Sequence, residues 1–344
     1  MTAVWTALAA ILIFCVMIFV HELGHFISAK LLGIRVHEFA IGMGPKLISK
    51  KKGETLYSVR LLPLGGFCAL EGEAQSSADE KALSNKPAWV KLIVMAAGSC
   101  MNLLLGLVLL FCLYTSVQSV VVPYVASVEA GSPAAACDIQ PGDEIIQLNG
   151  RRIHIAYDLH WATEKLDANP ATVVVKRENG TKETLSITPR MQQGKTKLGL
   201  VMTKADNNLL LTAKTAFYET VFYSRVVLES FIDLIRGNIS ISSMSGPVGI
   251  VSEIGGAVSQ AQEQGLAGIL SLLQMTVLLT VNLGVFNLLP IPALDGGRIF
   301  FVLVEMIRRK PLPPEKEGMV HMIGFVLLIL LSIFIAYMDV LRLI

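Results

Sequence analysis

Three residues near the N-terminus, His21, Glu22 and His25, have the types and spacing of a metal site. Two histidines four residues apart lie on one face of a helix about one turn apart, so their imidazoles can bind a single zinc ion. A glutamate beside the first histidine can take a proton from a water on that ion. The motif HExxH therefore predicts a zinc hydrolase with His21 and His25 as metal ligands and Glu22 as the catalytic base.

The motif lies inside an apolar run, about Ala3 to Ala29, that is long enough to cross a bilayer. An ionisable residue in a spanning helix costs about 2.5–3.5 kcal/mol on insertion scales, and here three such residues fall within one helical turn and a half. Side chains that extend to the membrane surface are usually Lys or Arg. A metal site therefore explains this polar cluster better than a surface-seeking one.

A zinc hydrolase usually has three protein ligands, so another segment must supply the third. The candidate is Asp295, in the sequence NLLPIPALDGGR. Pro290 and Pro292 end the preceding apolar run, and the two glycines after Asp295 let the backbone fold locally. Aspartate is also common in turns and helix caps. The first and third spans run in the same direction, however, which brings Asp295 and the histidines to the same side of the membrane.

The composition indicates an integral membrane protein. Of the 344 residues 53% are hydrophobic, with a mean hydropathy of +0.59. The net charge of +2 gives no reason to expect a nucleic-acid partner. Five scattered cysteines without a CxxC pair argue against a disulfide framework. The first apolar run lacks a cleavage site and is expected to be a retained helix.

Four apolar segments, about 3–29, 88–117, 267–289 and 319–338, are expected to be transmembrane helices. Lys and Arg gather in the connection between the first two spans and in that between the last two. By the positive-inside rule both connections are cytoplasmic and both termini are outside. The long region between the second and third spans is then extracytoplasmic.

This external region is expected to have two parts. Residues 120–204 combine β-rich runs, a helical segment AYDLHWATEKLDA and a hairpin that turns at Asn179-Gly180, which is typical of a small α/β domain. The following segment, AKTAFYETVFYSRVVLESFIDLIRG, is an amphipathic helix that lies on the membrane surface or packs on the bundle. We expect boundaries at 1–118 (two spans and their connection), 119–205 (the α/β domain), 206–266 (an amphipathic helical region) and 267–344 (the last two spans).

Together these motifs resemble the bacterial site-2 proteases of the RseP/RasP type, which are intramembrane zinc metalloproteases. The resemblance rests on HELGH in the first span, NxxPxPxLDGG after the third and a PDZ-like domain between the second and third, and SGPVGI adds to it. It implies an α-helical polytopic membrane protein of the bacterial cytoplasmic membrane with four transmembrane helices. An extracytoplasmic PDZ-like domain would be inserted in it. The stretch KLISKKKGETLYSVRLLPLGGF is expected to be a hairpin that turns at Lys52-Gly53-Glu54, and the resemblance implies that this β-hairpin is membrane-associated and lies beside the active site.

The resemblance also implies the roles of individual residues. His21, His25 and Asp295 would bind Zn²⁺, and Glu22 would be the general base. An edge strand of the hairpin could pair with an unwound substrate; a plain amphipathic loop is the alternative. The expected substrate-binding residues are asparagines, whose amides both donate and accept hydrogen bonds: Asn282, Asn287 and Asn102, the last retained although Gly98-Ser99 stands where the family has Gly-Pro.

The sequence AGSPAAACDIQPGDEIIQLNG resembles the PDZ signature, with Cys137-Asp138-Ile139 where small-Gly-Leu is common. Such a domain binds a peptide terminus or filters substrates by size, and the sequence leaves both open.

The expected function is cleavage of single-pass membrane proteins, such as anti-sigma factor-type regulators or remnant signal peptides. This regulated intramembrane proteolysis would follow a first extracytoplasmic cut. The alternative is a membrane-anchored PDZ peptide receptor or scaffold with a vestigial metal site, which predicts damage to a catalytic residue; Glu22 is intact. A transporter is disfavoured because no inverted repeat is found.

Overall fold

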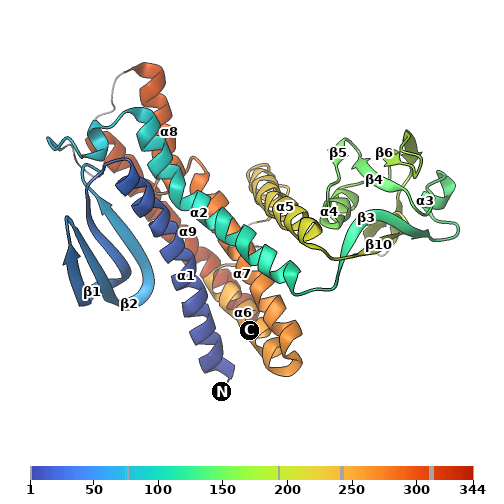
Figure 1. The fold of residues 1–344 in the computed structure, drawn as a ribbon, viewed down its shortest axis with the longest axis horizontal. Helices are drawn as coiled ribbons and strands as arrows, with labels where there is room; N and C mark the ends of the chain where they lie inside the picture. Colours follow the sequence, from blue (N-terminus) through green and yellow to red (C-terminus); the bar gives the residue numbers. More distant parts are fainter. Residues whose placement is uncertain are drawn as a thin grey trace. The chain divides into compact units, whose positions relative to one another are not determined.

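The computed structural model describes residues 2–343 except 74, 76, 193, 241–243 and 310–313. These residues form two compact units. One comprises Met1–Leu109 and Tyr223–Ile344, and the other Leu110–Phe222. Figure 1 shows the long helices of the first unit running alongside one another, and the strands of the second unit gathered with two short helices.

Four long apolar helices belong wholly or mainly to the first unit. They are α1 (Thr2–Leu31), α2 (Ala88–Thr115), α7 (Leu266–Leu288) and α9 (Pro314–Leu343). Each contains a stretch long and apolar enough to cross a membrane. The four predicted spans are therefore confirmed as helices, and the chain has the architecture of a multi-pass membrane protein.

Small residues bring the spans into close contact. A methyl group on Gly24 of α1 would lie 2.4 Å from the carbonyl oxygen of Ala97 in α2, and one on Gly284 of α7 would lie 3.0 Å from that of Ser99. Helices in membranes associate through such small residues because these let the backbones approach. Since Gly24 is part of HELGH, α2 crosses α1 at the predicted metal site.

Three further helices are α5 (Leu209–Ile235), α6 (Pro247–Gln264) and α8 (Asp295–Arg308). Ile254 and Val258 of α6 are buried in one cluster with Ile13 and Met17 of α1. The region expected to be amphipathic and helical, 206–266, contains α5 and α6, and α6 packs on the first span. Asp339 of α9 fixes the start of α6 by accepting the backbone N–H groups of Gly246 and Gly249 at 3.1 and 2.8 Å.

Between α1 and α2 the chain forms the strands β1 (Val36–Lys52) and β2 (Thr55–Leu70), which flank a turn at Gly53-Glu54. Each strand bends, so that two segments of β2 pair with β1 at residues 36–41. Residues 56–59 lie on one side of this segment and residues 66–70 on the other. Within the described residues no other strand pairs with 66–70, which makes this segment an edge. Phe39, Cys68 and Leu70 are buried together with Ala29 of α1 and Val94 of α2, so the sheet is fixed to both helices. The short 3₁₀ helix η1 (Leu83–Asn85) precedes α2.

The second unit has a sheet with the strand order β10-β3-β4-β6-β7, and β5 pairs with β4. Alternate residues of its strands, including Val125, Ile145, Val173 and Val175, face a buried core. Helix α4 covers this core through Leu159 and Ala162. The bounds of its elements are β3 (Ser119–Val128), α3 (Pro133–Ala136), β4 (Glu144–Leu148), β5 (Arg151–Arg152), α4 (Ala156–Glu164), β6 (Ala171–Lys176), β7 (Lys182–Ile187), β8 (Arg190–Gln192), β9 (Lys195–Lys197) and β10 (Leu200–Asp206).

Candidate metal centre

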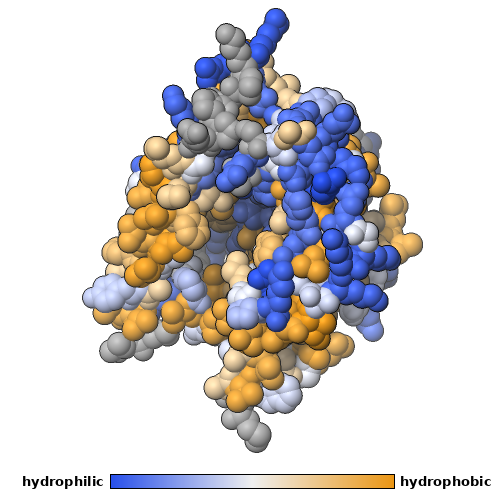
Figure 2. Space-filling model, turned by 90° about the vertical axis from the view of Figure 1, so that its left-hand side faces the viewer, coloured by the Kyte–Doolittle hydropathy of each residue, from blue (hydrophilic) through white to orange (hydrophobic). Residues whose placement is uncertain are grey.

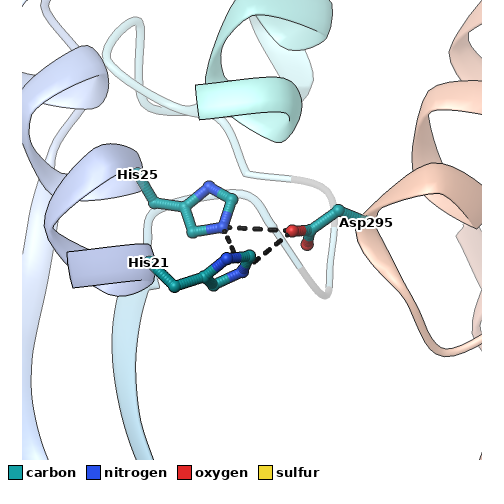
Figure 3. A group of neighbouring side chains, drawn as sticks. All are labelled: His21, His25 and Asp295. Atoms are coloured by element: carbon teal, nitrogen blue, oxygen red, sulfur yellow. Dashed lines mark hydrogen bonds and ion pairs between the residues drawn. The ribbon is translucent and has the colours of Figure 1, made fainter. Parts of the chain in front are cut away.

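Three side chains from two distant parts of the sequence point at one another. His21 and His25 project from α1, and Asp295 is the first residue of α8 (Figure 3). Oδ2 of Asp295 lies 3.1 Å from Nε2 of His21 and 3.3 Å from Nε2 of His25, and the two Nε2 atoms are 3.3 Å apart. The structure therefore brings together the three residues that the sequence predicts as metal ligands, and their ligand atoms all lie within 4.8 Å.

This triangle fits a tetrahedral metal. In a zinc site with bonds of about 2.0–2.1 Å, neighbouring ligand atoms are about 3.3 Å apart. Nδ1 of His25 lies 2.8 Å from the carbonyl oxygen of Val94 and donates to it, so the neutral imidazole carries its lone pair on Nε2. Oδ2 of Asp295 is buried and has no hydrogen-bond partner among the described residues. Acceptor atoms that converge without a donor between them are the environment that a cation requires.

Asn102 of α2 lies behind His21. Its amide is completely buried and its Nδ2 atom is 3.4 Å from Nδ1 of His21, while its Oδ1 atom has no partner among the described residues. With the amide oxygen and nitrogen exchanged, Oδ1 accepts the Nδ1–H of His21. His21 then presents the lone pair of Nε2 to the centre, as His25 does. This position suits a residue that orients a ligand, whereas the sequence predicts Asn102 as a substrate-binding residue.

Gly98 completes the wall of the centre on the side of α2. A methyl group on Gly98 would lie 2.4 Å from Nε2 of His25 and 2.8 Å from Nε2 of His21. No side chain can be placed there without displacing the ligand atoms. Because glycine has no Cβ, this position leaves space for the two imidazoles and for a metal between the ligands.

Asp295 is positioned by a sharp reversal after α7. Helix α7 ends at Leu288 and α8 begins at Asp295, where the positive end of the helix dipole favours a carboxylate.

The two glycines that follow have a different role from the predicted one. They are helical, and a methyl group on Gly296 or Gly297 would lie 2.1 or 2.5 Å from the carbonyl oxygen of Leu289 or Ile291. Close packing of the reversal, rather than backbone freedom, is why glycine is needed here.

A cavity of about 390 Å³ adjoins the three ligands. Glu22 lines it, as do residues 67–70 of the edge strand. The side of the molecule that carries β1 and β2 is hollowed, with hydrophilic residues in the depth of the hollow, a mainly hydrophobic surface on one side of it and a mainly hydrophilic surface on the other (Figure 2). Cys68 also lines the cavity, and burial raises the pKa of its thiol.

An ion pair in this cavity is missing from the sequence-based prediction. Arg298, one turn after Asp295 on α8, donates to a carboxylate oxygen of Glu73, and both side chains line the cavity. The other oxygen of Glu73 accepts the backbone N–H of Leu70 at 3.3 Å. Glu73 thereby links the end of the edge strand to the helix that carries Asp295. Glu73 and Arg298 are more than 200 residues apart in the sequence, so their pairing could not be predicted. The sequence indicates only that Arg298 lies one helical turn after Asp295.

The other predicted substrate-binding residues lie apart from this cavity. Asn282 and Asn287 are on α7, and neither lines it. The Oδ1 atom of Asn282 is buried without a hydrogen-bond partner among the described residues. Their role in substrate binding stays a prediction.

The chain is similar to known proteins over almost its full length. Residues 9–331 match the family model described as Peptidase family M50. A protein of Clostridium acetobutylicum that is named as a zinc metalloprotease is 37% identical, over 96% of each chain. The regulator of sigma-W protease RasP of Bacillus subtilis is 30% identical, over 98% of this chain and 99% of its own. The PDZ domain of an SdrC-like protein from Listeria innocua is 19% identical with a TM-score of 0.22, covering 26% of this chain and all of its own.

The family match covers both predicted ligand segments and all four apolar helices in whole or in large part. The relatives align over almost the full length of the chain. The chain therefore belongs to peptidase family M50, the site-2 proteases, and is a membrane-embedded zinc metalloprotease.

Proposed function

We propose that this metalloprotease holds zinc through His21, His25 and Asp295 and cleaves single-pass membrane proteins within or near their membrane span. The observation that carries the proposal is the convergence of three ligand atoms from α1 and α8 on one point beside Glu22, in a cavity at the end of two apolar helices. The substrates would be anti-sigma factor-type regulators or remnant signal peptides, after a first extracytoplasmic cut. The name of the Bacillus subtilis relative, a regulator of sigma-W protease, supports a regulatory substrate.

The chemistry divides between the metal and the chain. When bound, zinc lowers the pKa of a water molecule and polarises the carbonyl of the scissile bond. Glu22 takes the proton of the attacking water and passes it to the leaving amine. The carbonyl of Val94 and the amide of Asn102 hold the two imidazoles in the tautomer that leaves each Nε2 free.

The edge strand 66–70 supplies a surface for an extended substrate. A peptide bond within a helix is shielded by its own hydrogen bonds, so the substrate must unwind before attack. A peptide that pairs with residues 66–70 replaces those hydrogen bonds with new ones to the sheet. The strand lies beside the base, since a methyl group on Gly66 would lie 3.6 Å from Cγ of Glu22. Asn282 and Asn287 would hold the substrate backbone further along α7.

The second unit would act on the external part of the substrate. A groove of about 330 Å³ lies between α4 and β10, lined by Leu159 and Thr163 on one side and by Leu198, Gly199 and Met202 on the other. Strand β10 pairs with β3 along one edge, and among the described strands its other edge has no partner. An extended peptide terminus can add to such an edge, as in PDZ domains. We place this unit outside the cytoplasmic membrane and the metal centre toward its cytoplasmic side, on the charge distribution of the connections.

The experiment that tests this function compares wild type with Glu22→Gln. Both are co-expressed with a single-pass substrate already trimmed on its external side, and zinc is measured on both purified proteins. Glutamine keeps the shape of the side chain but cannot accept the proton, so we expect normal zinc content and a loss of cleavage of about 100- to 10,000-fold. A wild type without zinc, or a variant that cleaves normally, would favour the peptide receptor instead.

A further inference from the structure

The reversal that carries Asp295 contains a strained residue. Ala293 has a φ of 81°, a backbone conformation that a residue with a Cβ rarely adopts. It lies two residues before Asp295 and lines the same cavity. A residue persists in such a conformation only where its surroundings hold it there, and strain of this kind is concentrated at functional sites.

The hydrogen-bond partner of Ala293 comes from the fourth span. Its backbone N–H donates to Nδ1 of His321 on α9 at 2.9 Å. Because Nδ1 accepts, the proton of the neutral imidazole is on Nε2. The side chain of His321 is only 16% exposed, and its ring packs edge-on against Phe301 of α8 with the ring centres 5.5 Å apart. The imidazole is thus held between α8 and the reversal.

A second contact joins α9 to the same reversal. Gly324 lies one turn after His321, and a methyl group there would lie 2.4 Å from Cβ and 2.7 Å from the carbonyl oxygen of Pro292. The backbone of α9 therefore presses directly on the residue before Ala293. Two residues of the fourth span, His321 and Gly324, thus fix two consecutive residues of the reversal, Ala293 and Pro292.

We propose that His321 is a positioning residue for the metal ligand Asp295. By accepting the N–H of Ala293, it holds the reversal in the strained conformation that aims Asp295 at His21 and His25. This inference rests on the proposed role of Asp295 as a zinc ligand. It assigns a function to the fourth span, which contributes no residue to the metal triangle.

The test measures the zinc affinity of the full-length detergent-solubilised protein by competition with a chelator, using two matched polar variants. In His321→Asn the amide oxygen lies near the position of Nδ1 and can accept the N–H of Ala293. In His321→Gln the amide lies near the position of Nε2 and cannot. We expect His321→Asn to bind zinc within about threefold of wild type and His321→Gln to bind about 10- to 100-fold more weakly, the effect typical of groups that orient metal ligands.

A second comparison relieves the strain itself. Glycine adopts φ of 81° without penalty, so Ala293→Gly should make the reversal less dependent on His321. We expect His321→Gln to weaken zinc binding less in the Ala293→Gly background than in wild type. Equal zinc affinities of the Asn and Gln variants, or an equal loss in both backgrounds, would overturn the proposal. If Asp295→Ala binds zinc as tightly as wild type, the proposed ligand set itself is wrong, which is a separate outcome.

Discussion

The backbone of Gly98 lies directly against the imidazole of His25: a methyl group on Gly98 would be 2.4 Å from Nε2. This is shorter than any ordinary contact between a carbon and a nitrogen atom, and Nε2 is the atom that faces Asp295. The close approach of α2 thus limits where the metal and its ligands can lie.

Gly98→Ala should therefore weaken zinc binding. The methyl group displaces both imidazoles, and we expect a loss of affinity of about 10- to 100-fold, measured by chelator competition. Gly256→Ala in α6 is the matched control, because a methyl group there meets no atom within 4 Å. It should leave zinc affinity unchanged and stabilise the helix slightly. Unchanged zinc affinity in Gly98→Ala would contradict the described packing.

Asn102 separates ligand orientation from substrate binding. If its amide oxygen accepts the Nδ1–H of His21, Asn102→Asp keeps the acceptor and should retain zinc, whereas Asn102→Leu removes the acceptor and should bind zinc about 10- to 100-fold more weakly. If Asn102 binds substrate instead, both variants keep zinc and raise KM. Zinc affinity and KM measured on the same preparations distinguish the two roles.

The ion pair between Glu73 and Arg298 should be energetically coupled. Both side chains are partly exposed, 25% and 33%, so the coupling is smaller than for a fully buried pair. We expect a double-mutant cycle with Glu73→Gln and Arg298→Gln to give about 1–2 kcal/mol, from thermal or denaturant unfolding in detergent. Strictly additive effects would show that Glu73 does not hold α8 to the edge strand.

Glu38 makes the sheet of β1 and β2 sensitive to acid. Burial raises the pKa of its carboxyl, but hydrogen bonds from Ser58 at 2.6 Å and Arg60 at 2.7 Å lower the pKa further than burial raises it. Because the pKa of Glu38 is lower in the folded than in the unfolded state, its ionisation stabilises the fold at pH values above the ordinary pKa of about 4.3. This stabilisation is lost as the pH falls through the lower pKa of the folded state.

Hydrogen exchange of residues 36–60, corrected for its intrinsic pH dependence, should therefore increase as the pH is lowered below about 4.3. Glu38→Gln removes the titrating group, so its protection should be weaker at neutral pH and change less with acid. The same pH profile in wild type and variant would assign the acid sensitivity to another group.

Local patterns were sufficient to predict the spans and to single out His21, His25 and Asp295, which the structure brings together. Each span is a long apolar run that must be helical in a bilayer, and the helical period places His21 and His25 on one face. The turn at Gly53-Glu54 follows in the same way from residues next to each other in the chain. For Asp295 the direction of the spans was enough to place it on the side of the histidines.

Contacts between distant segments could not be predicted. The doubled pairing of β1 with β2 depends on which segments come to lie side by side after the chain bends, and the register shifts between residues 41 and 48. The packing of α6 on α1 requires a partner more than 200 residues away. The strain at Ala293 is imposed by His321 and by close packing around Pro292, so the sequence PALDGG alone does not reveal it.

The most direct measurement is zinc-edge X-ray absorption on the purified wild-type protein. The account predicts a first shell of nitrogen and oxygen at about 2.0–2.1 Å with the outer-shell scattering of two imidazoles, from His21 and His25. A sulfur shell at about 2.3 Å would assign the metal to one of the five cysteines instead. That result, or a protein that holds no zinc, would contradict the account.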